Sequence, residues 1–195
     1  AIRLDPSLLA AYAPRAELHY RADRRAEAIA DYTRVLELRP DYWFAHAPLG
    51  VLLYGEGEWG GAYVHLRAAY GEEPEEPAWE LLAALAARRG GDARTAASVL
   101  QALLGDLERT SWYWDVARCL LEPSADFVLI TRIERETNRA LRARMLFYLA
   151  EASTLAGRPA GAAHAYLLEA KDAGAADDPE TRLARWELAK LGVSP

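Results

Sequence analysis

A 34-residue period is the feature that most constrains how this chain can fold. Pro6, Pro40 and Pro74 are spaced 34 residues apart, and AYAPRA at 11–16 aligns with AHAPLG at 45–50 at the same offset. A period of this length is typical of arrays in which one small supersecondary unit is repeated. One such unit cannot bury its apolar face alone, so the chain needs stacked neighbours to form a core.

The segment 43–74 shows what one repeat contains. Its apolar residues follow helical spacing on both sides of Gly57, which supplies a turn because glycine tolerates positive φ. Gly50 and Ala62 are small where two helices would cross closely, and Pro74 ends the second helix. We expect two short antiparallel helices here, with Ala28 and Ala96 at the matching crossings of the neighbouring repeats.

This pattern resembles the tetratricopeptide repeat, whose signature is W-x2-L-G-x2-Y, then A-x3-F, then P. The signature slots hold His46, Leu49, Gly50, Leu53, Ala62, Leu66 and Pro74. The resemblance implies an all-α fold, a right-handed α-solenoid of stacked antiparallel helix pairs forming a TPR-like superhelix.

The resemblance also divides the chain, as a single domain over 1–195. The expected parts are the end of a preceding repeat (1–8), repeats 1 to 3 (9–42, 43–76 and 77–110), an irregular repeat 4 (111–142), repeat 5 (143–176) and a capping helix (177–195). Repeat 4 is irregular because Gly157 follows Gly91 by 66 residues, two fewer than two full periods. The last segment is either a cap or the first helix of a sixth unit.

Finer expectations concern the second half of the chain. In repeat 4, Ser124 should cap a helix over 125–136 and Trp114 should lie in the core. In repeat 5, Ala162 takes the small-residue slot. In the last helix, Asp178 and Pro179 mark the start, and Arg182, Arg185 and Lys190 should face water.

Composition excludes several function classes. The net charge of −6 argues against a general nucleic-acid binder, and no apolar run approaches the roughly 20 residues that span a bilayer. Cys119 is the single cysteine, which favours a cytoplasmic protein in which it packs as a small apolar residue. The histidines, at 19, 46, 65 and 164, form no metal-binding motif, and no phosphate-binding glycine loop is present. We therefore predict no enzymatic activity, no cofactor and no metal.

The origin of the chain is also indicated. Asparagine, glutamine, cysteine and methionine are scarce, which fits a heat-adapted protein or a GC-rich genome, and we expect a bacterial source. The opening AIRLDP resembles the last turn of a repeat, which suggests a fragment of a longer protein.

In tetratricopeptide proteins the first helix of each repeat lines a concave groove that binds a peptide or a helical segment of a partner. Carried onto this chain, the partner-binding residues are Glu17, Tyr20, Arg21, Phe44, Val51, Tyr54, Leu85, Arg88, Arg89 and Trp112. The family's clamp for a chaperone's C-terminal carboxylate uses Lys and Asn. Its slots here hold Ala13, Glu17, Ala47 and Val51, so the expected ligand is an apolar peptide or an amphipathic helix.

Several interpretations stay open at this point. Tyr20 and Tyr54 either contact a partner or shield neighbouring helices, and at least one of Trp112 and Tyr113 should be exposed. The arginines at 132, 135, 139, 142 and 144 form either an ion-paired, solvated face or a docking strip for an acidic partner. The alternatives to a scaffold are a regulatory domain of a larger enzyme or transcription regulator, and a self-association domain that forms homo-oligomers.

Overall fold

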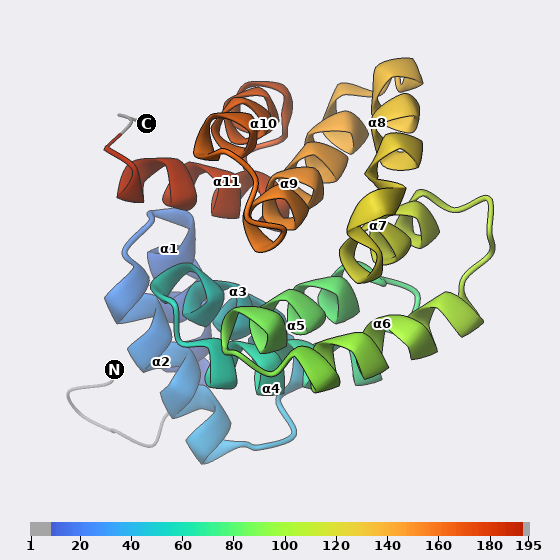
Figure 1. The fold of residues 1–195 in the computed structure, drawn as a ribbon. Helices are drawn as coiled ribbons and strands as arrows, with labels where there is room; N and C mark the ends of the chain where they lie inside the picture. Colours follow the sequence, from blue (N-terminus) through green and yellow to red (C-terminus); the bar gives the residue numbers. More distant parts are fainter. Residues whose placement is uncertain (1–8, 193–195) are drawn as a thin grey trace. The chain divides into compact units, whose positions relative to one another are not determined.

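A computed structural model describes residues 9–192, and over that range every regular element is helical, with no strand (Figure 1). The predicted end of a preceding repeat, 1–8, lies outside the described residues. The all-α prediction is confirmed, and consecutive helices pack as pairs. The chain divides into two compact units, one ending at Gly90 and the other beginning at Gly91. That boundary falls inside predicted repeat 3, and the single-domain and repeat boundaries stay predictions.

The first unit holds two helix pairs and one further helix. They are α1 (Leu9–Arg21), α2 (Arg25–Leu38), the 3₁₀ turn η1 (Trp43–Ala45), α3 (His46–Glu56), α4 (Trp59–Glu72) and α5 (Ala78–Arg89). The pairs α1–α2 and α3–α4 each pack closely, α2 contacts α3, and α5 packs on α4. Each helix therefore buries its apolar face against its neighbours in sequence, as a repeat array requires.

The second unit is less regular. It holds α6 (Ala93–Asp106), α7 (Trp112–Leu121), the 3₁₀ turn η2 (Pro123–Ala125), α8 (Asp126–Arg135), α9 (Arg139–Leu155), α10 (Ala160–Ala173) and α11 (Pro179–Lys190). The pair α9–α10 has the most extensive packing, and α11 contacts both of its helices. Helix α7 packs against α6, α8 and α9. No described helix has the length and apolar character needed to cross a bilayer.

Left-handed backbone recurs between paired helices. Gly57, Gly91 and Gly157 have φ of 81°, 89° and 67°, as the turn prediction requires. Asp23 occupies the same slot, 34 residues before Gly57, and has a φ of 55°. A short polar side chain tolerates this conformation better than most, so the turn keeps its shape without glycine.

The helix crossings predicted for the pairs α1–α2 and α3–α4 are confirmed, and the alanines predicted for the first three crossings are buried. Ala28, Ala62 and Ala96 are all 0% exposed. At Gly50 an added Cβ would lie 2.7 Å from Leu66 Cγ and 3.1 Å from the Leu66 backbone nitrogen. The helices α3 and α4 therefore approach closely enough at this point that only hydrogen fits.

The fifth repeat departs from the prediction by one residue. Ala163 is 8% exposed and lies in the core, whereas Ala162, the expected crossing residue, is half-buried. The reason is the turn: α10 begins three residues after Gly157, while α4 begins two residues after Gly57. The added turn residue rotates the buried face of α10 by one position.

Two predictions around α7 and α8 are wrong. Ser124 does not cap α8, because residues 123–125 already form η2 and the helix begins at Asp126. Trp114 is half-buried, with the Arg118 guanidinium 5.4 Å from its ring centroid. The buried face of α7 is centred on Val116 and Leu120 instead.

The last helix is more deeply buried than expected. Asp178 and Pro179 do precede and begin it, although Asp178 makes no capping hydrogen bond. Arg182 is only 8% exposed, and the four other residues from Glu180 to Ala184 are fully buried. The first turns of α11 are therefore buried, and of the three residues predicted to face water only Lys190 is exposed, whereas Arg185 is half-buried.

Candidate partner-binding site

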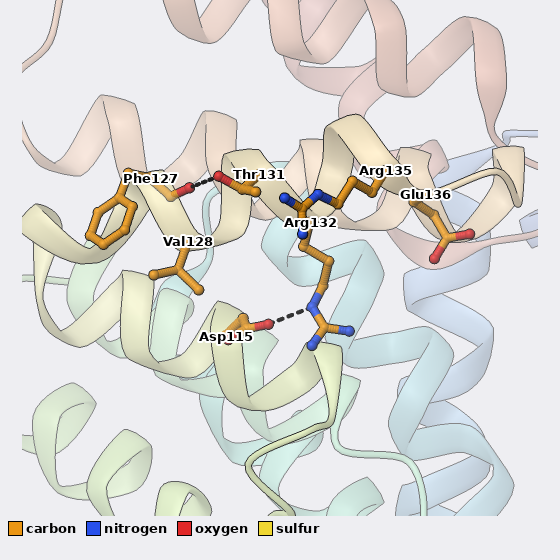
Figure 2. Close-up of a pocket in the computed structure, with 7 residues that line it drawn as sticks. All are labelled: Asp115, Phe127, Val128, Thr131, Arg132, Arg135 and Glu136. Atoms are coloured by element: carbon orange, nitrogen blue, oxygen red, sulfur yellow. Dashed lines mark hydrogen bonds and ion pairs between the residues drawn. The ribbon is translucent and has the colours of Figure 1, made fainter.

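An open groove lies beside α8 in the second unit (Figure 2). It encloses about 520 Å³ between α8 and the start of α7. Its lining residues are Asp115, Phe127, Val128, Thr131, Arg132, Arg135 and Glu136. Most of them come from one helix, so the groove is in effect an outer face of α8 with α7 as its wall.

The helical periodicity of α8 explains this face. Leu129 and Ile133, four residues apart, turn inward and are at most 3% exposed. Phe127 lies outside that stripe and is 66% exposed, next to the half-buried Val128. Phe127 and Val128 together give this outer face of α8 an apolar part. The sequence already carried this signal, since Phe127 and Val128 are apolar but out of phase with the buried stripe.

The floor of the groove is held by an ion pair. Arg132 Nε donates to Asp115 Oδ2 at 2.5 Å, and Arg132 Nη2 donates to the Thr110 carbonyl oxygen at 3.0 Å. Asp115 is only 6% exposed. Arg132 therefore connects α8 to α7. Arg135, one turn further along α8, is exposed and presents its charge at the rim of the groove.

Several residues of the predicted groove in the first unit do lie at the surface. Phe44 is 61% exposed and stacks on Trp43 with ring centroids 3.5 Å apart. Arg21 is exposed and bonds Glu17 at 2.6 Å, while Glu17 also accepts from the Tyr32 hydroxyl at 2.9 Å. Tyr20, Arg88 and Arg89 are half-buried. Partner binding by these residues stays a prediction.

Three of the predicted contact residues are in the core. Val51 and Leu85 are 1% exposed and Tyr54 is 0% exposed. The Tyr54 ring meets Trp59 edge-on at 5.2 Å, so it shields the α3–α4 pair. The expectation that these three present their side chains to a partner is not met, because neighbouring helices cover the positions that the repeat pattern assigns to the groove.

Trp112 is held by its own chain. Its ring stacks on Tyr113 at 3.8 Å, and the Arg144 guanidinium lies 5.0 Å from its centroid. Trp112 and Tyr113 are both half-buried, so neither is the exposed aromatic that we expected. Arg144 in turn pairs with the fully buried Glu180 at 3.2 Å.

This buried carboxylate has a shifted pKa. Burial raises the pKa of Glu180 despite the neighbouring Arg144 charge, and burial likewise raises the pKa of Tyr148, whose hydroxyl donates to Glu180 at 3.0 Å. The cluster ties α9 to α11 through polar groups inside the core.

Most arginines of the run 132–144 connect their helices to neighbouring ones. Arg142 pairs with Glu169 of α10 at 2.6 Å, and Arg139 donates to the Asp172 carbonyl oxygen at 3.3 Å. Together with Arg132 and Arg144, these side chains reach other helices rather than residues one turn away. Neither sequence interpretation describes them well, and Arg135 is the member left at the groove rim.

The remaining reactive side chains offer little chemistry. Cys119 is 1% exposed, and burial raises its pKa to about 12, which confirms that it packs as an apolar residue. Among residues 9–192 no group of three or more His, Cys, Asp or Glu side chains is placed to hold a metal ion. Two histidines contact each other: the Nδ1 atoms of His46 and His65 are 2.9 Å apart.

These helix pairs, their recurring left-handed turns and their small crossing residues define the fold of a tetratricopeptide repeat protein. The chain is similar in structure to YrrB, a TPR protein with an unusual peptide-binding site, at a TM-score of 0.51 and 16% identity over 98% of this chain and 96% of that one. Yeast Tom70 aligns at a TM-score of 0.43 and 19% identity, over 98% of this chain and 42% of that one. No family model matches the chain, and the comparison with curated proteins finds no match.

Proposed function

We propose that this protein is a non-catalytic, cytoplasmic scaffold that binds a peptide or helical segment of a partner protein. The observation that supports it most is the open groove of α8, which combines exposed apolar surface with a cation on a repeat fold. YrrB, which has the same fold, is a peptide-binding protein, and this favours the same class of ligand here. Aromatic and arginine side chains are the usual anchors of such contacts.

The groove's dimensions suggest what the ligand looks like. Phe127 and Arg135 are eight residues apart on α8, which corresponds to about 12 Å along the helix axis. An extended peptide covers that distance with about four residues at roughly 3.3 Å each. We therefore expect a ligand with an apolar side chain near Phe127 and Val128 and a carboxylate about four residues away, close to Arg135.

Surface residues of the first unit are proposed as a separate contact region. Phe44 with its stacked neighbour Trp43 is the apolar part, and Arg21 is the exposed charge. Tyr20, Arg88 and Arg89, which are half-buried, remain proposed contributors. Regulation of an attached module and self-association remain the alternative roles.

Panning a random peptide library on the purified chain tests the scaffold proposal. Peptides with the apolar and acidic spacing described above should be enriched, and their binding should weaken at least tenfold in Phe127→Ser and in Arg135→Glu. Val64→Ser is the matched control, because Val64 is 59% exposed on α4, outside the groove. If no peptide is enriched, or if the groove variants bind as well as the control, the proposal fails. Light scattering of the same samples would reveal self-association.

A further inference from the structure

The contact between His46 and His65 joins the two helices of the most regular repeat. His46 begins α3 and His65 lies in the middle of α4. Their Nδ1 atoms are 2.9 Å apart, and their ring centroids are 5.1 Å apart. The difference, 2.2 Å, leaves 1.1 Å for each ring, which is the distance from an imidazole's centre to its own nitrogen. The two rings therefore meet nearly end to end, with the Nδ1 atoms pointing at each other.

This orientation fits a hydrogen bond and excludes a shared metal ion in the same geometry. Two imidazoles that bind one metal direct both lone pairs at a third point beside the line joining the nitrogens. Here each Nδ1 is directed at the other, so a proton on one must be shared with the lone pair of its partner.

One ring of the pair therefore carries its proton on Nδ1 and donates it, whereas the other accepts through an unprotonated Nδ1 and, when neutral, carries its proton on Nε2.

The pair can accept one extra proton but not two. A proton added to Nε2 of the donating ring leaves its Nδ1–H bond to the accepting ring intact. A second proton can bind only at Nδ1 of the accepting ring, where it would place two N–H groups head to head at 2.9 Å. That state has no hydrogen bond and two like charges in contact, so the rings must separate.

The surroundings of the two rings also oppose their protonation. Burial lowers the pKa of His46 and of His65, and the His46 charge lowers the pKa of His65 further. Two influences act in the opposite direction on the pKa of His46: the negative charge of Glu72, on the same helix as His65, and the backbone carbonyl group of Pro40. Ion pairs engage several other charged groups on the packed helices: Arg34 with Glu37 on α2, Arg25 of α2 with Glu56 of α3, and Arg67 of α4 with Glu80 of α5.

We propose that His46 and His65 form a proton-sensing contact between α3 and α4 that is made at neutral pH and is lost when the solution becomes mildly acidic. The folded protein binds these protons more weakly than the unfolded chain does. Stability from the contact is therefore complete above the ordinary histidine pKa of about 6.5 and is lost as the pH falls below it.

Titration of the histidine ring protons by NMR, on the whole chain, tests the contact directly. The two resonances that disappear in His46→Asn and His65→Asn should titrate below pH 6.5, in two separated steps. Resonances that titrate together, or at or above the ordinary value, would overturn the proposal.

Thermal unfolding at several pH values provides the second measurement. The midpoint of the wild type should fall between pH 7.5 and 5 more steeply than that of His46→Asn/His65→Asn, whose amides can hydrogen-bond without taking up a proton. His164→Asn, in the second unit, is the matched control and should keep the wild-type slope. An unchanged slope in the double variant would refute the proposal. So would a rise in midpoint when Zn²⁺ or Ni²⁺ is added that the double variant lacks, since the pair would then be a metal site.

Discussion

Replacing Gly50 with alanine tests whether the helices of a repeat really cross at van der Waals distance. The new Cβ would lie 2.7 Å from Leu66 Cγ, 3.0 Å from its Cδ2 and 3.1 Å from its backbone nitrogen. These atoms belong to the branch point and backbone of α4, so relief requires a shift of the helix. Overpacking of this kind costs about 2–3 kcal/mol, and the better helix propensity of alanine returns about 1 kcal/mol. We expect a net loss of roughly 1–2 kcal/mol.

The control is Gly71→Ala. Gly71 lies near the end of α4, where an added Cβ would meet nothing within 4 Å. Only the gain in helix propensity applies at this position, so the free energy of unfolding of this variant should be unchanged or higher by up to about 1 kcal/mol. Urea unfolding followed by circular dichroism measures both changes. If Gly50→Ala proves as stable as Gly71→Ala, the close crossing of α3 and α4 is refuted.

Three further predictions concern single residues. Asp23→Gly should raise the free energy of unfolding by roughly 0.5–1 kcal/mol, because glycine adopts the left-handed turn without strain; a loss of stability in urea unfolding would contradict this. Arg67→Gln should destabilise the protein more at pH 7 than at pH 4.5. Burial already raises the pKa of Glu80, which is 3% exposed, and the substitution leaves the charged form of this carboxylate without its ion-pair partner. Equal losses of stability at both pH values would argue against the ion pair. Cys119, with its pKa raised to about 12, should react with a thiol reagent only after denaturation, and fast labelling of the native chain would show that α7 is packed less tightly than described.

Much of the local structure could be read from the sequence. The positive φ of Gly57 and Gly91 and the burial of Ala28, Ala62 and Ala96 follow from the 34-residue period. Each depends on interactions within one helix pair, where sequence spacing fixes which residues meet. The Ala162 prediction failed because one extra turn residue shifts the helix register, which the spacing of glycines alone does not reveal.

The candidate sites were predicted less well. Assigning Val51, Tyr54 and Leu85 to a groove assumed that the repeat pattern sets exposure, yet exposure depends on how closely the neighbouring helices approach. The sequence prediction missed the face of α8 around Phe127, because the tetratricopeptide resemblance places partner-binding residues on the first helix of each repeat. Its out-of-phase apolar residues were nevertheless visible in the sequence.

By itself, the sequence determined the helical repeats, their turns and their crossing residues, since these depend on periodicity and on glycine or alanine at given positions. Only the tertiary structure decided which side chains from distant segments meet. It placed Arg132 on Asp115, Arg144 on Glu180 and the ring of His46 end to end with that of His65. Pairings of this kind depend on the angle and register between helices, which are set by packing and leave no local trace in the chain.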